Sequence, residues 1–72
     1  MKYYLNHANR RITIKQDEDL NITASYKGEI LCKQTIDNYL NWIHSPETQE
    51  EFENNEPTIK DYIEHLLEIY RL

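Results

Sequence analysis

The sequence predicts an α+β fold, in which a small antiparallel sheet of three to four strands occupies the N-terminal half and two to three helices pack on one face of it. Apolar residues alternate with polar ones in the first half of the chain, whereas from residue 36 onward they recur at steps of three and four. The only glycine, Gly28, lies between two alternating segments, where a tight hairpin needs a residue that accepts a positive φ.

Three segments have the alternation of a half-buried strand. Residues 11–15 and 20–26 alternate polar and apolar side chains, and Leu20 is the first apolar residue of the second segment. Residues 29–33 follow the glycine as the third strand. The alternation leaves open whether residues 2–6 add a further strand at the start.

Two shorter helices follow the strands. Residues 36–43 have apolar side chains at helical spacing. Ser45 then offers a capping hydroxyl, and Pro46 suits the first position of a helix. The helix that they begin, residues 46–54, is acidic, and Phe52 is its only apolar residue.

The last segment, residues 58–72, has the clearest helical period in the chain. Thr58 and Asp61 have the spacing of a capping box, in which a hydroxyl and a carboxylate bond the free amides of the first turn. Ile69 widens the apolar face of this helix, and Leu67 lies off it. The face itself consists of Ile59, Tyr62, Ile63, Leu66 and Tyr70.

The length of 72 residues predicts one domain, residues 1–72, which buries about 60% of the surface of its unfolded chain. No run of 18 apolar residues is present, so we expect no contact with a membrane. The single cysteine, Cys32, cannot form an internal disulfide, and the N-terminus lacks the apolar core of a signal peptide. These features predict a reducing, cytoplasmic setting.

The net charge of −5 is concentrated in the last third of the chain. Residues 1–33 carry six Lys or Arg against four Asp or Glu, whereas residues 47–72 carry eight acids against two bases. An acidic surface repels phosphate, so we expect no direct binding of nucleic acid. The same surface suits a basic groove on another protein.

Carboxylates spaced along a helix and a loop resemble the phosphates of a nucleic acid backbone, although their simpler meaning is a solvated surface that keeps a small domain soluble. Phe52 would anchor such an interface, or would instead tether its helix to the core. Tyr4 and Trp42 are candidates for a second surface contact, or cover the core. The predicted binding residues are therefore Glu47, Glu50, Glu51, Phe52, Glu53, Glu56, Asp61, Glu64, Tyr4 and Trp42.

No catalytic or metal-binding motif is present. The histidines, His7, His44 and His65, lack the short spacing of metal ligands. Cys32 lies in a strand, where it is expected to be a small buried side chain and not a nucleophile. The sequence has no glycine-rich phosphate loop, so it predicts no enzyme activity, no metal and no cofactor.

The chain is short, acidic and rich in Asn, Ile, Lys, Glu and Tyr, with strands before helices. In these respects it resembles small proteins of phages that infect low-GC bacteria. Among them it is similar in size, charge and element order to anti-CRISPR proteins and other inhibitors of host defence. The resemblance implies action in the cytoplasm of a bacterial host, without catalysis, by covering a nucleic-acid-binding site on the target.

Two functions are therefore predicted. In the first, the protein is a non-catalytic inhibitor or modulator whose acidic C-terminal face occupies a basic site on a nucleic-acid-binding protein or nuclease complex, such as a CRISPR–Cas protein. In the second, it is a small structural or regulatory subunit that acts through an apolar or aromatic surface. That subunit would form a homodimer through a strand edge or through Trp42.

Overall fold

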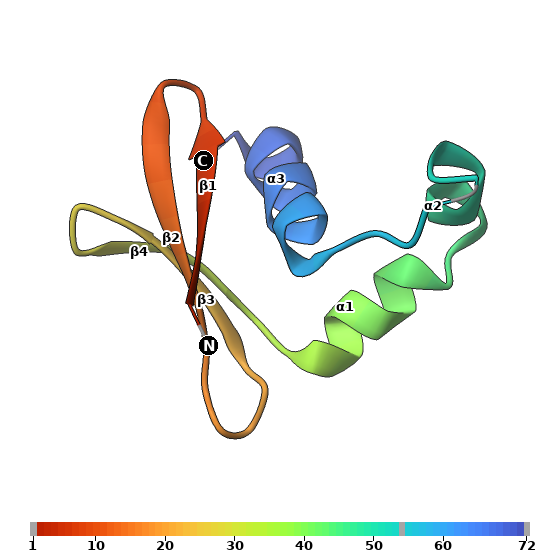
Figure 1. The fold of residues 1–72 in the computed structure, drawn as a ribbon, viewed down its shortest axis with the longest axis horizontal. Helices are drawn as coiled ribbons and strands as arrows, with labels where there is room; N and C mark the ends of the chain where they lie inside the picture. Colours follow the sequence, from red (N-terminus) through yellow and green to blue (C-terminus); the bar gives the residue numbers. More distant parts are fainter. Residues whose placement is uncertain (1, 54, 72) are drawn as a thin grey trace.

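The computed structural model describes residues 2–53 and 55–71 and has the predicted α+β arrangement, with a four-stranded antiparallel sheet followed by three helices (Figure 1). The strands are β1 (Lys2–His7), β2 (Arg10–Gln16), β3 (Ile22–Tyr26) and β4 (Glu29–Gln34), and they lie in the order β1-β2-β3-β4. The segment that the sequence left open, residues 2–6, is therefore a strand at the edge of the sheet.

Two hairpins turn through residues with positive φ. Ala8 and Asn9 join β1 to β2 with φ of 51° and 63°, and Lys27 and Gly28 join β3 to β4 with φ of 50° and 83°. A pair of positive φ values matches the right-handed twist of the flanking strands. The hairpin predicted at Gly28 is confirmed.

The predicted strand start at Leu20 is wrong. Leu20 has a φ of 65° and is 49% exposed, and β3 begins at Ile22. The reason is a side chain that competes with the strand ladder: the Asp17 carboxylate accepts hydrogen bonds from the backbone N–H groups of Asp19 and Asn21, each at 2.9 Å. These bonds close a turn that carries Leu20 into solvent.

The helices are α1 (Ile36–Ile43), α2 (Pro46–Glu51) and α3 (Ile59–Tyr70). The hydroxyls of Thr35, Ser45 and Thr58 accept from backbone N–H groups and begin them, and both halves of the predicted capping box at Thr58 are present.

The second helix is shorter than the predicted range of 46–54. It ends at Glu51, and the backbone at Phe52 leaves the helical conformation with φ −105° and ψ 22°. A run of carboxylates without bases destabilises a helix through like-charge repulsion. Residue 54 lies outside the described part of the chain.

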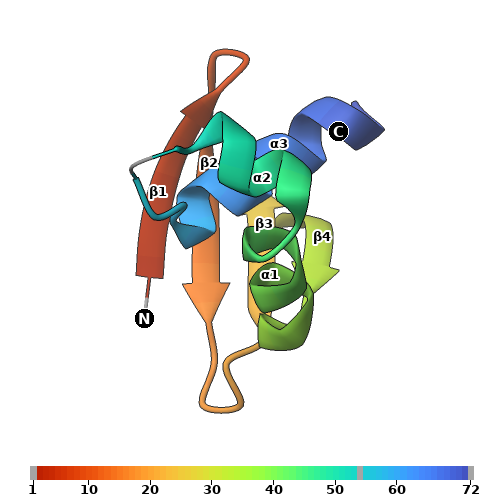
Figure 2. The ribbon, with the colours of Figure 1, turned by 90° about the vertical axis from the view of Figure 1, so that its right-hand side faces the viewer.

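The core lies between the inner face of the sheet and α3. Four side chains of β2 and β3, Ile12, Ile14, Ile22 and Ala24, have 0% exposure. They belong to one cluster with four side chains of α3, namely Tyr62, Ile63, Leu66 and Leu67. Figure 2 shows α3 crossing the strands, and Figure 1 shows α2 as the helix farthest from the sheet.

The predicted apolar face of the last helix is right in its first turns and wrong at its end. Leu67, predicted to lie off the face, is 1% exposed, whereas Tyr70 and Ile69 are 65% and 56% exposed. Because α3 crosses the sheet, Leu67 is above the strands and the last turn is not. Of the other tyrosines, Tyr62 is buried and Tyr4 is exposed.

Two tyrosine hydroxyls tie the helical segments together. Tyr62 donates to the Gln34 side-chain oxygen of β4 at 2.9 Å, and Tyr39 of α1 donates to the Pro57 carbonyl oxygen at 2.7 Å. Burial is the main cause that raises the pKa of both phenols, which stay neutral and able to donate.

Among residues 2–53 and 55–71, none of the helices has the length and apolar character that a membrane span requires.

Replacing Ile63 with alanine is expected to lower the free energy of unfolding by about 2–5 kcal/mol, because it leaves a cavity in a closed core. Ile69→Ala removes the same atoms from an exposed part of the same helix. It is expected to change the free energy of unfolding by less than about 0.5 kcal/mol. Urea unfolding measures both. Equal losses would contradict the packing of α3, and Ile63→Val, at about 0.5–1.5 kcal/mol, tests it if the alanine variant does not fold.

Candidate functional site

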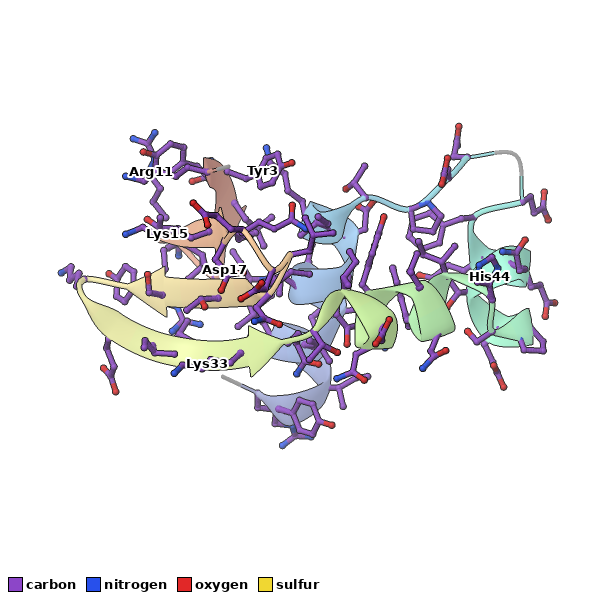
Figure 3. The ribbon with its side chains drawn as sticks, turned by 90° about the horizontal axis from the view of Figure 1, so that it is seen from below. Tyr3, Arg11, Lys15, Asp17, Lys33 and His44 are labelled. Carbon is purple, nitrogen blue, oxygen red and sulfur yellow. The ribbon has the colours of Figure 1, made fainter. Side chains whose placement is uncertain are left out.

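Most Lys and Arg lie in the strand half of the molecule together with four acids, whereas most Asp and Glu lie among the helices. Figure 3 shows Arg11, Lys15 and Lys33 on the sheet, at the other end of the molecule from His44, which lies among the helices. The predicted acidic residues are on the helical side, where α2 and the loop after it carry five exposed glutamates and α3 carries Asp61 and Glu64, both half-buried. The helical layer is therefore the negative side of the protein.

Trp42 is the centre of an aromatic cluster and not an isolated surface side chain. Its indole ring lies 5.9 Å from the ring of Phe52 in an edge-on arrangement, 5.2 Å from Tyr62 and 5.3 Å from His65, between ring centroids. These are ordinary distances for attractive ring contacts. The cluster joins α1, the end of α2 and α3, and the contact of Phe52 with Trp42 holds the end of α2 against α1.

Carboxylates surround this cluster and form an open groove of about 250 Å³. Asp61, Glu64 and Glu68 follow one another on one face of α3, since residues three and four apart on a helix are neighbours. Glu51 approaches them from the end of α2. We call this the acidic groove; its lining residues are Trp42, Glu51, Phe52, Asp61, Glu64, His65 and Glu68.

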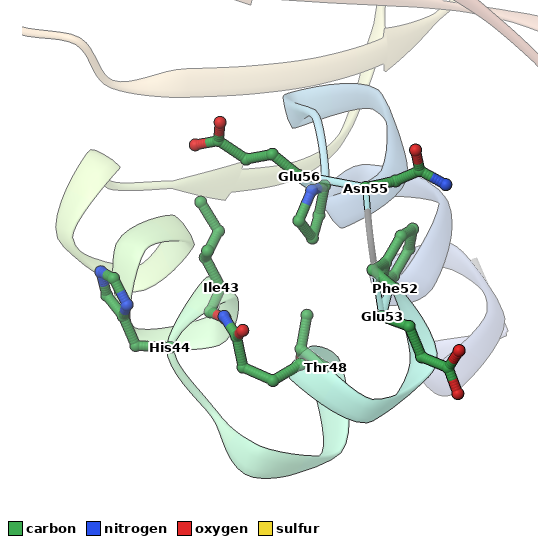
Figure 4. A pocket seen from close by; sticks show the side chains of 9 residues that line it. Ile43, His44, Thr48, Phe52, Glu53, Asn55 and Glu56 are labelled. Atoms are coloured by element: carbon green, nitrogen blue, oxygen red, sulfur yellow. The ribbon is translucent and has the colours of Figure 1, made fainter.

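A second hollow of about 340 Å³ lies on the other side of Phe52 (Figure 4). Figure 4 shows the apolar atoms of Ile43 and Phe52 facing its interior and the carboxylates of Glu53 and Glu56 turned outward. Thr48 at its base is 4% exposed, and its hydroxyl accepts from Ser45 at 2.7 Å. Two further predicted acids therefore stand at the rim of a partly apolar hollow beside the acidic groove.

The structure does not bring all the predicted residues together. Glu47 and Glu50 are exposed on α2 but line neither of these hollows. Tyr4 lies on the outer face of the sheet, where the Arg11 guanidinium is 4.3 Å from the centre of its ring. Tyr4 and Trp42 therefore belong to opposite sides of the protein and cannot form one contact surface.

Three residues of the site could not be found from the sequence pattern. His65 and Glu68 line the acidic groove, and His7, at the end of β1, approaches Glu64 and Glu68 so closely that one ligand atom of each lies within 4.8 Å of the others. One imidazole nitrogen and two carboxylate oxygens are a donor set that could hold a divalent cation. His7 is far from α3 in the sequence, so the sequence could not place it near the glutamates. The four-residue spacing of Glu64 and Glu68 is the one part of this donor set that the sequence contains.

Cys32 does not have the surroundings of a catalytic thiol. It lies on the inner face of β4, opposite Ala24, and is half-buried. Burial raises the pKa of its thiol, and a backbone hydrogen bond with Ala24 lowers it by less. At neutral pH the thiol is therefore protonated, whereas a nucleophilic cysteine needs the thiolate.

Comparisons with protein families, with curated proteins and with solved structures found no match.

Iodoacetamide is expected to modify Cys32 more slowly in the folded protein than in the urea-unfolded chain at pH 7, because the raised pKa leaves less thiolate and the side chain is half-buried. Mass spectrometry of timed samples measures both rates, and the unfolded chain is the control for the reagent. A faster reaction in the folded protein would indicate an activated thiol and would reopen cysteine chemistry.

Proposed function

We propose that this protein binds another protein without catalysis, and that its acidic face occupies a basic nucleic-acid-binding site on that partner. One observation carries the proposal: four carboxylates, of Glu51, Asp61, Glu64 and Glu68, gather around an aromatic floor between α2 and α3. Acids that only keep a domain soluble need no such common centre.

The chemistry of the acidic groove suits an arginine or lysine side chain. A guanidinium pairs with a carboxylate through two parallel hydrogen bonds and also stacks on aromatic faces. Trp42 and Phe52 supply the aromatic surface, and Glu51 and Glu64 approach it from two helices. Basic sites that bind nucleic acid are rich in these side chains, so the groove fits one cation of such a site while the outer glutamates attract the rest.

The resemblance to phage-encoded inhibitors of host defence indicates the class of partner. We propose a nucleic-acid-binding protein or nuclease complex of a bacterial host, of which CRISPR–Cas proteins are one kind. The setting would be the bacterial cytoplasm, where the free thiol of Cys32 stays reduced.

Neutralising the groove is expected to weaken binding of a hexa-arginine peptide about tenfold or more, since each charge-assisted hydrogen bond contributes about 1.5–3 kcal/mol. The variant is Glu51→Gln with Glu64→Gln and Glu68→Gln. Its control carries Glu18→Gln, Asp19→Asn and Glu29→Gln, which change the net charge equally on the β2–β3 loop and β4. Fluorescence of the only tryptophan, Trp42, reports occupancy, because its ring lies in the groove.

A peptide of citrulline, which is neutral and nearly the same shape, should not bind. Pull-downs from the lysate of a low-GC bacterium, washed at low and high salt, extend the test to natural partners. The proposal requires that a nucleic-acid-binding protein leaves with salt and is lost with the groove variant alone. An equal loss of binding with the control variant would mean that only the net charge matters, and would contradict specific binding in the groove.

A second function, a regulatory subunit that pairs through an apolar surface, is favoured by the end of α3. Ile69 and Tyr70 are 56% and 65% exposed, although both are apolar enough to be buried. Such side chains are often covered by a partner or a second copy.

If this alternative holds, the protein sediments as a dimer, and Ile69→Ser with Tyr70→Ser converts it to a monomer. Leu20→Ser is the control, because Leu20 is 49% exposed in a loop far from α3 in the sequence. Sedimentation velocity across a concentration series measures the change. A wild-type protein that stays monomeric at every concentration would exclude the homodimer.

A further inference from the structure

The outer face of the sheet carries four of the five Lys and Arg of the strands, namely Lys2, Arg11, Lys15 and Lys33, whereas Arg10 shares the face of Ile12. Because strand residues point alternately to the two faces, the side chains that flank the buried Ile12, Ile14 and Ile22 point away from the helices. Figure 1 shows all three helices on the other side of the sheet. We call this surface the open sheet face.

Three lysines lie in one row across the open sheet face. Lys2 is opposite Lys15, Lys15 is opposite Thr23, and Thr23 is opposite Lys33, so the row crosses all four strands. With neighbouring strands about 4.8 Å apart, it extends over about 14 Å. All three lysines are exposed.

The pairing of Lys2 with Lys15 has a cost in folding. Like charges directly opposite each other on antiparallel strands are destabilising. No ion pair with a carboxylate of residues 2–53 or 55–71 offsets this repulsion at Lys15 or Lys33. The carboxylate nearest in the sequence, Asp17, is engaged by the backbone of its own loop. A polyanion on this face would supply the missing negative charge.

The next row adds an aromatic ring and hydroxyl groups. Tyr4 is opposite Thr13, and Thr13 is opposite Ser25. Tyr4 is 42% exposed, and two cations flank its ring, with Arg11 at 4.3 Å and Lys2 at 5.7 Å from the ring centre. These contacts hold the cations on the open sheet face.

The surface between the cations is hollowed. Lys2, Lys15 and Thr23 line an open depression of about 500 Å³ together with Gln16 and Asp17. Thr13, Thr23 and Ser25 are short and half-buried, so the longer lysine side chains stand around them. Hydroxyls beside lysines are suitable donors to phosphate oxygens.

We infer that the open sheet face binds the backbone of single-stranded nucleic acid, with Lys2, Lys15, Lys33 and Arg11 at the phosphates and Tyr4 beside a base. Proteins that bind single strands combine a basic surface with aromatic rings in this way. An acidic peptide would need the cations but not the exposed ring. The surface is separate from the acidic groove, so this inference does not depend on the proposed function.

The net charge of −5 does not prevent such binding. The acids of α2 lie in the helix farthest from the sheet (Figure 1), and at physiological ionic strength the Debye length is only about 8 Å. Within the strands and their turns, six Lys or Arg outnumber the four acids Asp17, Glu18, Asp19 and Glu29, so the strand side keeps a net positive charge. The expectation that nucleic acid is excluded was based on the acidic last third of the chain, which forms the helical layer and not the open sheet face.

Fluorescence anisotropy of the full chain with labelled oligo-dT and oligo-U of 15 nucleotides tests the inference. The logarithm of the affinity should fall with that of salt with a slope of about −2 to −3, since each phosphate neutralised in a single strand contributes about −0.7. Lys15→Gln with Lys33→Gln should weaken binding at 50 mM salt about tenfold or more and reduce the slope by about 1.4.

Two further variants separate specific from general effects. Lys27→Gln with Lys60→Gln removes the same charge from the β3–β4 turn and from α3 and should leave the affinity within about threefold. Tyr4→Leu should weaken binding about fivefold or more with the slope unchanged, because stacking does not release ions.

Unfolding by urea provides a readout without nucleic acid. Lys15→Gln should not lower the urea midpoint of unfolding, because the substitution removes the like-charge pair with Lys2.

Three results would overturn the inference. One is that the control, Lys27→Gln with Lys60→Gln, weakens binding as much as Lys15→Gln with Lys33→Gln does. Another is the failure of both oligonucleotides to bind at 50 mM salt. The third is tighter binding of a poly-glutamate peptide, or self-association that needs Lys15 and Lys33, since either would assign the face to an acidic protein or to a second copy.

Discussion

The packing of α3 against the inner face of the sheet is the contact on which the rest of the structure depends. A chain of 72 residues buries few side chains, and here Ile63 and Leu67 of one helix cover Ile12 and Ile14 of the sheet. This contact decides which sheet face is closed and which side of α3 remains in solvent. It also positions Tyr62, whose ring contacts the ring of Trp42 and whose hydroxyl donates a hydrogen bond to Gln34 of β4.

The same contact separates the charges of the protein. Period-two alternation turns the apolar side chains of a strand inward, so the intervening Lys15 and Arg11 must point outward. Period 3.6 leaves Glu64 and Glu68 on the side of α3 away from the core. A molecule with a radius of gyration of 12.0 Å thereby has a basic sheet surface and an acidic helical surface. Two surfaces of opposite charge can serve two partners, and the total charge describes neither.

The acidic groove needs three segments that are not contiguous in the sequence. Trp42 comes from α1, Phe52 from the end of α2 and His65 from α3. Their ring contacts hold the glutamates of α2 and α3 around one centre. The one thiol of the chain, Cys32, lies outside this groove on the inner face of β4, and burial raises its pKa.

The sequence by itself determined the types of element, because alternation, helical spacing and capping side chains such as Thr58 act over a few residues. The sequence-based prediction was wrong where contacts between more distant residues mattered. Hydrogen bonds to the Asp17 carboxylate place Leu20 in a turn, and the crossing of α3 over the strands buries Leu67 and exposes Tyr70. The sequence also supplied most acids of the groove, but not Glu68 and His65, nor the gathering of all these side chains around Trp42. Only the tertiary structure decided these, because distances between separate elements depend on how their apolar faces meet and not on the order of residues along the chain.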